Sequence, residues 1–214
     1  MSDAIKSMIE GQIKPNKVTD ARIIEAFETI PRDAFVPKAK REVAYLDEDL
    51  EVAPGRFIME PMVLARLVDA AGIGADEVIL DVGCTTGYST VILAHLGNVV
   101  VGLEEDENLA KAAEETLESL GIENGAVITG PLRKGVPSQG PFQVIFLNGA
   151  VEEIPDGILD QLADGGRLVT VLVKDGVGRG HMITRVDGHL GGKDLFDASV
   201  PFLPGFRKKA EFSF

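Results

Sequence analysis

From Glu77 onward, short apolar runs alternate with longer amphipathic segments. Five runs rich in Val, Ile and Leu have the length of single buried strands: 78–82, 99–103, 126–129, 144–147 and 167–173. Helices are expected between them at 88–96, 108–120 and 155–162. This alternation predicts an α/β protein whose parallel sheet is covered on both faces. The run 181–186, followed by Gly188, indicates an antiparallel hairpin at the sheet edge.

The first 60 residues have a different pattern, in which helical periodicity is broken by turn-forming residues. Segments 3–13 and 20–29 predict two helices separated by the turn-rich stretch 14–17, and Pro31 ends the second helix. Another helix is expected at 62–71. We interpret the chain as one domain, 1–214, with a helical N-terminal extension at 1–60 and an α/β core at 76–175.

Composition narrows the possible classes of function. The formal net charge of −13 repels nucleic-acid phosphates, so no nucleic-acid partner is expected. A single cysteine excludes an intrachain disulfide, and three scattered histidines give no metal-site spacing. No apolar run reaches the roughly 18 to 20 residues of a membrane span, and the N-terminus lacks a signal pattern, so a cytoplasmic protein is expected. The basic run Arg207-Lys208-Lys209 is interpreted as solvated surface.

The segment 78–89 runs from an apolar strand through a turn of small residues into a helix. Gly83 and Gly87 carry no Cβ, which lets a ligand approach the main chain at the carboxyl edge of the sheet. Glu104 ends the next predicted strand about 20 residues later, where a carboxylate accepts both hydroxyls of a ribose. Thr85 replaces the second glycine of a dinucleotide fingerprint, and acidity around Asp81 favours a cationic ligand over a diphosphate.

These residues also have purely structural interpretations. The two glycines are compatible with a plain strand-to-helix turn, and Glu104 with a solvated strand end. The acidic residues 105–107 are interpreted as helix N-terminal residues that interact favourably with the macrodipole. Cys84 is interpreted as a small turn residue rather than a nucleophile, because the sequence places no histidine to activate it.

A set of short motifs extends over nearly the whole chain. In the first 50 positions they are Gly11-Gln12-Ile13, Val18, Ile30-Pro31-Arg32, Phe35-Val36-Pro37, Ala44-Tyr45 and Asp47-Glu48-Asp49-Leu50. Later they are Leu80-Asp81-Val82-Gly83, Gly87-Tyr88-Ser89, 117–121 and 159–168. With these motifs the chain resembles the protein-L-isoaspartate O-methyltransferases. The glycine turn is shared with many methyltransferases, whereas the N-terminal motifs are more diagnostic of this family.

The resemblance implies a Rossmann-like methyltransferase fold, with a mostly parallel sheet, a helical N-terminal extension and an antiparallel edge hairpin. It implies S-adenosylmethionine as the cofactor, bound by the core at 76–175 and released as S-adenosylhomocysteine. The implied reaction methylates the carboxylate of isomerised aspartyl residues in protein repair; that carboxylate is already ionised at neutral pH, so alignment of the reacting atoms matters more than a base. The cofactor-binding residues expected are Asp81, Gly83, Cys84, Thr85, Gly87, Glu104, Glu105, Pro131, Leu132 and Asn148.

The chain departs from the family pattern at two sites. The family's Thr-Ile-Ser-x-Pro motif, whose hydroxyls face the reacting atoms, is replaced by Phe57-Ile58-Met59-Glu60-Pro61. Met59 and Glu60 therefore take the catalytic positions, and an anionic Glu60 beside a carboxylate acceptor would cost on the order of 1 to 4 kcal/mol. The family's Gly-Asp-Gly, which meets the adenine amino group, is Gly130-Pro131-Leu132 here, so a backbone amide or Asn148 is the expected substitute.

Three functions remain open at this point. The first is an active carboxyl methyltransferase with a protein or peptide acceptor, for which Arg56 and Lys38 are candidate acceptor-binding residues. The second is a methyltransferase-like protein that has lost catalysis, or acts on a different acceptor, which the missing hydroxyls favour. The third, a nicotinamide-dependent oxidoreductase, is disfavoured by Thr85 and by the lack of a Tyr-x-x-x-Lys proton relay.

Overall fold

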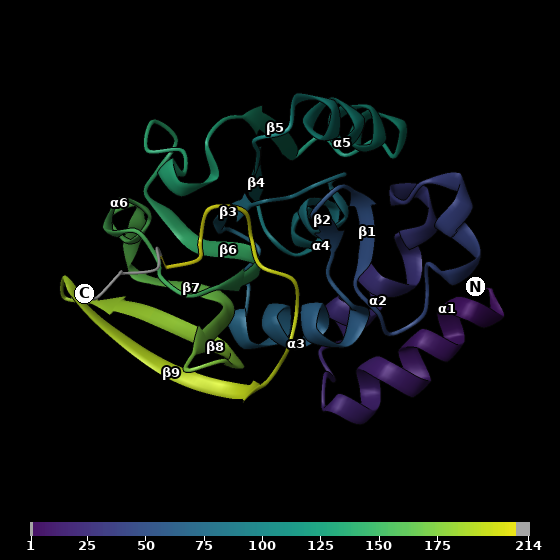
Figure 1. Ribbon diagram of the computed structural model, residues 1–214, viewed down its shortest axis with the longest axis horizontal. Coiled ribbons are helices and arrows are strands. Elements are labelled where there is room, and N and C mark those ends of the chain that lie inside the picture. The colour runs from purple at the N-terminus through teal and green to yellow at the C-terminus, as the bar shows by residue number, and fades with distance from the viewer. Residues whose placement is uncertain (1, 209–214) are drawn as a thin grey trace, which may run out of the picture.

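A seven-stranded sheet forms the centre of the computed structural model, which describes residues 2–208 (Figure 1). Its strand order is β5-β4-β3-β6-β7-β8-β9. The strands are β3 (Val78–Val82), β4 (Val99–Glu104), β5 (Gly125–Thr129), β6 (Phe142–Val151), β7 (Leu162–Lys174), β8 (Val177–Val186) and β9 (His189–Asp197). The first five run parallel, and β7, β8 and β9 form an antiparallel meander. The predicted α/β fold with an antiparallel edge hairpin is confirmed.

Alternate residues of the central strands face two separate cores. Ile79 and Val100 point into a core shared with the N-terminal extension and with α3 (Pro61–Ala71), α4 (Tyr88–Leu96) and α5 (Glu107–Ser119). Leu80 and Val101 point into the other, which is closed by the segment 131–136, by α6 (Asp156–Leu159) and by residues near the C-terminus. The predicted helix 155–162 is only four residues long, since it ends at Leu159, a turn follows, and β7 begins at Leu162.

The N-terminal extension packs as a group of short helices beside α3 and α4 (Figure 1). Its α-helices are α1 (Asp3–Met8), continued by a π-helical turn to Ile13, and α2 (Ala21–Thr29), whose N-cap Asp20 accepts from Arg22 N. The extension was expected to be helical throughout, but its last part is not. It ends in a small antiparallel hairpin, β1 (Leu50–Ala53) and β2 (Arg56–Ile58), which reverses at Gly55 with φ of 70°.

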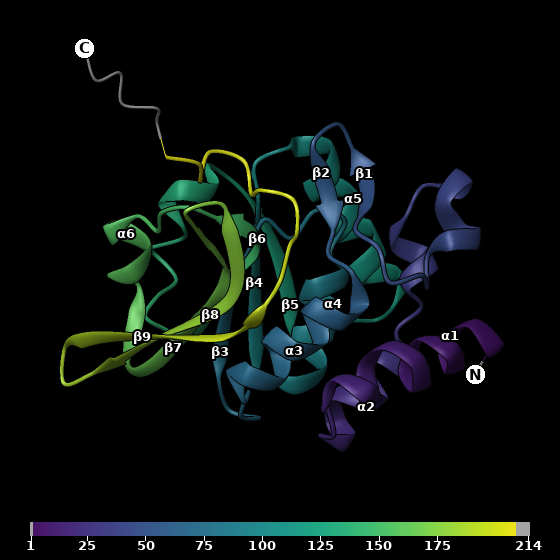
Figure 2. The same ribbon diagram turned by 60° about the horizontal axis from the view of Figure 1, so that its bottom comes forward.

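The chain after β9 returns to the middle of the sheet as an extended segment, residues 198–206, which we call the strap. Ala150 N donates to Pro201 O at 2.9 Å and Leu203 N donates to Ala150 O at 2.8 Å, so the strap pairs with the carboxyl-terminal part of β6. Figure 2 shows this segment in yellow, passing from β9 over the edge of the sheet. The strap therefore covers the edge at which parallel α/β sheets bind ligands.

Within residues 2–208, no helix combines the length and the apolar character that crossing a bilayer requires. In the same part of the chain, no group of three or more His, Cys, Asp or Glu side chains is arranged to hold a metal ion.

Candidate active site

The turn between β3 and α4 is shaped by three residues with positive φ: Gly83 (82°), Thr85 (52°) and Gly87 (91°). Gly83 N donates to Leu103 O at 2.7 Å, which ties the turn to the neighbouring strand β4. A Cβ at Gly83 would overlap Cδ1 of Leu203 in the strap, so a glycine is needed for both conformation and space. The turn therefore presents main chain, rather than side chains, to the edge of the sheet.

A buried polar network lies directly beneath this turn. The Asp81 carboxylate accepts from Ser89 Oγ at 2.6 Å and from Thr90 Oγ1 at 2.8 Å, and Asn148 Nδ2 donates to Ser89 Oγ at 2.6 Å. Burial raises the pKa of Asp81 to about 6. Among the described residues, no donor reaches Asp81 Oδ1 or Asn148 Oδ1, although both oxygens are buried. Two such acceptors fit a ligand that brings N–H groups, such as an ammonium.

Glu104 stands at the end of β4, opposite the turn, and its side chain is fully buried. Its Oε2 accepts from Thr85 N at 2.9 Å, and its Oε1 accepts from Glu105 N at 2.8 Å and Asp106 N at 3.0 Å. Burial raises the pKa of Glu104, whereas Arg56 and these amides oppose the rise. The solvated strand end that was the alternative interpretation is therefore wrong.

Arg56, on β2, forms a buried ion pair with Glu104. Its Nη1 lies 3.8 Å from Glu105 Oε1 and has no hydrogen-bond partner among the described residues. Only 7 % of the Arg56 side chain is exposed. The space left between the hairpin, the turn and the strap is about 20 Å³, far below the roughly 300–1,000 Å³ of a typical small-molecule site. In this conformation Arg56 and Leu203 fill the place expected for the nucleoside.

The other predicted cofactor residues have varied surroundings. Cys84 is buried, and burial raises the pKa of its thiol well above the ordinary value, so it is a protonated turn residue. Leu132 is buried in the core that contains Leu80, whereas Pro131 and Glu105 are exposed. Lys38, one of the two acceptor-binding candidates, is also exposed. Direct contact of these residues with a cofactor stays a prediction.

The two expected catalytic positions, Met59 and Glu60, differ in their burial. Met59 is buried among apolar side chains. Glu60 is half-buried, its N–H donates to Asp49 Oδ1 at 3.0 Å, and burial together with Asp49 and Asp47 raises its pKa to about 7. Neither residue lines the open groove between the hairpin and the strap, whereas Phe57 from the same motif does.

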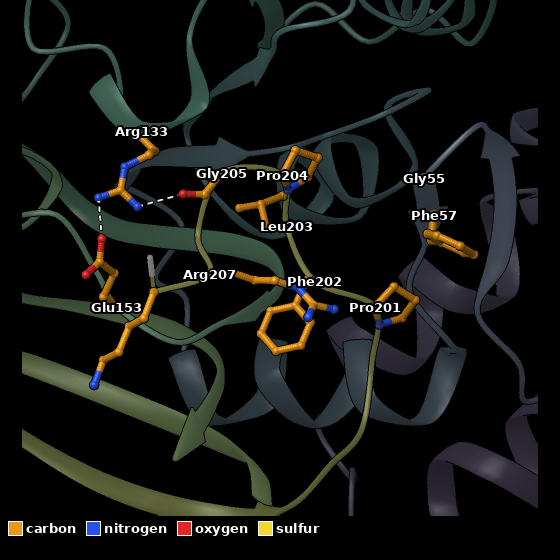
Figure 3. Close-up of a pocket in the computed structure, with 11 residues that line it drawn as sticks. Gly55, Phe57, Arg133, Glu153, Pro201, Phe202, Leu203, Pro204, Gly205 and Arg207 are labelled. Atoms are coloured by element: carbon orange, nitrogen blue, oxygen red, sulfur yellow. Dashed lines mark hydrogen bonds and ion pairs between the residues drawn. The ribbon is translucent and has the colours of Figure 1, made fainter. Parts of the chain in front are cut away.

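An open groove of about 1490 Å³ lies between the hairpin and the strap (Figure 3). In the close-up, Phe57 and Pro201 line one end, and Arg133 reaches towards Glu153 and the carbonyl of Gly205 at the other. Arg133 Nη2 lies 2.6 Å from Glu153 Oε1.

The basic residues at the end of the strap contribute to this groove. The guanidinium of Arg207 lies 4.0 Å from the centroid of the Phe202 ring, and Lys208 also lines the groove. Two members of the basic run predicted as solvated surface are thus exposed and also lie at a concave site, while Lys209 falls outside the described residues. Their position was not predictable from sequence, because only the return of the strap places them at the same groove as Phe57.

A family model described as "Protein-L-isoaspartate(D-aspartate) O-methyltransferase (PCMT)" matches residues 3–203. The chain belongs to this family. A protein-L-isoaspartate O-methyltransferase 2 from Anaeromyxobacter sp. (strain Fw109-5) is 38% identical over 164 residues, 77% of this chain and 68% of the relative. A protein-L-isoaspartate O-methyltransferase from Gloeobacter violaceus is 33% identical over 205 residues, 95% of this chain and 99% of the relative.

Solved structures of the same family have the same architecture. One titled protein-L-isoaspartate O-methyltransferase has a TM-score of 0.81 at 25% identity; the match covers 94% of this chain but 65% of that chain. A putative protein-L-isoaspartate O-methyltransferase from Plasmodium falciparum, in complex with S-adenosyl-L-homocysteine, has a TM-score of 0.78 at 22% identity. That match covers 94% of this chain and 99% of the other chain. The resemblance, the fold class and S-adenosylmethionine as the family's cofactor are confirmed, and the dinucleotide alternative finds no support.

Proposed function

We propose that this protein is a cytoplasmic S-adenosylmethionine-dependent methyltransferase that acts on the carboxylates of isoaspartyl residues in proteins. The observation that carries the proposal is the site itself, in a chain that the family model matches over residues 3–203. The glycine turn faces a buried Glu104, and the network beneath it has two buried acceptors that no donor within residues 2–208 reaches. Relatives over three quarters or more of this chain bear the name of that activity.

The polar atoms of the site match the polar groups of the cofactor. Glu104 provides the acceptor for ribose hydroxyls, and Gly83 allows close approach to the turn. The oxygens of Asp81 and Asn148 that no donor of the described residues reaches suit the amino group. When bound, the cofactor supplies an activated methyl group on a sulfonium. Ionised Asp81 and Glu104 would favour such a positively charged ligand over a polyanion. Arg56 must leave Glu104 before the ribose can use it.

The groove is the proposed acceptor site. It carries the cations Arg133, Arg207 and Lys208 with one carboxylate, Glu153, on a protein whose net charge is −13. A local excess of cations on an acidic protein attracts anionic segments and orients them. An isoaspartyl carboxylate needs no deprotonation at neutral pH, so these side chains and Phe57 act by positioning it and by excluding water.

One observation favours a second candidate, a member of the family that binds the cofactor but methylates a different acceptor or none. Phe57 and Met59 stand where the family motif has hydroxyls, and Met59 is turned into the core, so it cannot replace a serine in contact with the acceptor.

Isothermal titration with S-adenosylmethionine and S-adenosylhomocysteine, followed by transfer of labelled methyl groups, tests the proposal. The acceptor is an isoaspartyl peptide, and the same peptide with ordinary aspartate is the control. Binding with transfer only to the isoaspartyl peptide is expected. Binding without transfer would favour the second candidate, and the absence of binding by either nucleoside would overturn the cofactor assignment.

A further inference from the structure

We propose that Arg56 is an internal competitor of the cofactor: it occupies Glu104 in the closed form and must be displaced by the ribose hydroxyls. The inference rests on the proposed function for the identity of the ligand. It adds that the affinity for the cofactor is set by a residue of the β1–β2 hairpin, and that the closed site is a state of the protein that the cofactor has to open.

The carboxylate of Glu104 has no acceptor capacity left in the closed form. An ionised carboxylate offers about four lone-pair directions. Three are used by the backbone amides of Thr85, Glu105 and Asp106, and Arg56 takes a further one. A ribose diol must therefore replace at least one of these donors before either of its hydroxyls can donate to Glu104.

Arg56 is the donor that can leave. The three amides belong to the glycine turn and to the entry of α5, so their withdrawal would unfold the site. The guanidinium of Arg56, by contrast, has polar contacts only with Glu104 and, at 3.8 Å, with Glu105, and its Nη1 has no hydrogen-bond partner within residues 2–208. Few interactions therefore have to be broken to release the side chain.

The element that carries Arg56 is also suited to move. The hairpin has only two strands, paired at three positions, and it is not joined to the seven-stranded sheet. A two-stranded hairpin is marginally stable on its own. Its tip, Gly55, is exposed and would have no neighbour within 4 Å of a Cβ, whereas Leu50 and Ile58 at its base are buried. The tip can therefore swing about an anchored base.

The opposite wall of the closed site is Leu203 of the strap, which lies against Gly83. Residues 201–204, together with Gly55 and Phe57 of the hairpin, line both the small residual cavity and the open groove, so the two spaces adjoin, whereas Arg56 lines the cavity and not the groove. Displacement of Arg56 would join them, giving the nucleoside an entrance from the side on which the acceptor is proposed to bind.

The test compares the affinity for S-adenosylhomocysteine of the wild type, Arg56→Gln and Arg179→Gln by isothermal titration. Arg179 is a matched control because it is also ion-paired, with Asp194 and Asp197, but lies on the exposed hairpin of β8 and β9. Arg56→Gln is expected to bind at least about tenfold more tightly, since the competitor is removed. The control is expected to bind like the wild type.

A second measurement uses the unmodified protein, so it does not depend on the folding of a variant. Arginine side chains are modified with phenylglyoxal with and without S-adenosylhomocysteine, and the modified residues are identified by peptide mass spectrometry. Arg56 is expected to be protected without the nucleoside and modified faster with it, while Arg179 reacts equally in both. Unchanged or slower modification of Arg56 on binding would contradict the proposal.

The outcomes separate this inference from the proposed function. If the wild type and Arg56→Gln bind equally well, the competition is refuted while the cofactor assignment stands. If neither binds the nucleoside although both melt cooperatively, both are refuted. Tighter binding by Arg56→Gln supports both together.

Discussion

At the scale of the residue, Gly83 is the point at which backbone conformation and close packing coincide. Its φ of 82° disfavours any side chain, and its missing Cβ makes room for Leu203. We expect Gly83→Ala to lower the free energy of unfolding by ~1–3 kcal/mol, through strain and overpacking together. Urea unfolding measures the loss. The double variant Gly83→Ala/Leu203→Ala relieves the overpacking, so a double-mutant cycle should show a coupling energy between the two positions. If the two losses in unfolding free energy simply added, backbone strain alone would explain the effect of Gly83→Ala.

Glu60 and Asp49 give a second prediction at this scale. Burial raises the pKa of Glu60 to about 7 and that of Asp49 to about 6, above ordinary values of 4.5 and 3.8. The folded state therefore binds protons more tightly than the unfolded chain, and this contribution to stability is complete below about pH 4 and lost as the pH rises to about 7.

Replacement of Glu60 by glutamine removes its part of this dependence. The melting temperature of Glu60→Gln minus that of the wild type should thus be more positive at pH 8 than at pH 4.5. Glu48→Gln, which changes an exposed neighbour, is the control. A wild-type advantage that grows with pH would contradict the sign of these pKa shifts.

At the scale of the element, Arg167 of β7 connects three segments of the fold. It donates to the carbonyls of Ala71 and Gly72 at the end of α3, and its Nη2 lies 2.6 Å from Oε2 of Glu77. The ion pair also lowers the pKa of Glu77 against the effect of burial. Because the pair is mostly buried, its partners cannot turn to water when the arginine is removed.

We therefore expect Arg167→Ala to lower the free energy of unfolding by ~2–4 kcal/mol, since a part-buried carboxylate and two carbonyls lose their donor. Arg179→Ala removes an exposed ion-paired arginine and should cost less than ~1 kcal/mol. Chemical denaturation of the two variants side by side measures the difference. Equal losses would show that the connection through Arg167 contributes no more than a surface ion pair.

At the scale of the whole molecule, an acidic protein presents a groove with three cationic side chains. The attraction of an anionic peptide to this groove should weaken as salt shortens the Debye length. Arg207→Gln/Lys208→Gln is expected to raise the KM for an acidic acceptor peptide about tenfold at low salt, with little change in kcat or in cofactor affinity. If the KM of the double variant kept the salt dependence of the wild type, the groove would not be the acceptor site.

The sequence by itself determined the elements whose signals are local. The strand 78–82 and the helix 88–96 were predicted with their observed bounds, because an apolar run, a glycine turn and a helical face lie within 20 residues of each other. The expected roles of Gly83 and Gly87 came from the same stretch and that of Glu104 from the end of the next predicted strand, while the family followed from motifs along the chain.

Only the tertiary structure decided how distant segments meet at the site. Arg56 pairs with Glu104 across 48 positions, and Leu203 packs against Gly83 across 120. The hairpin 50–58 was hidden in a segment expected to be helical, and the helix predicted at 155–162 ends at Leu159. Buried ion pairs and the return of a strap depend on which surfaces face each other after the sheet has formed. No periodicity along the chain encodes that, so the sequence predicted where a cofactor would bind, and only the fold showed that Arg56 and Leu203 fill this place.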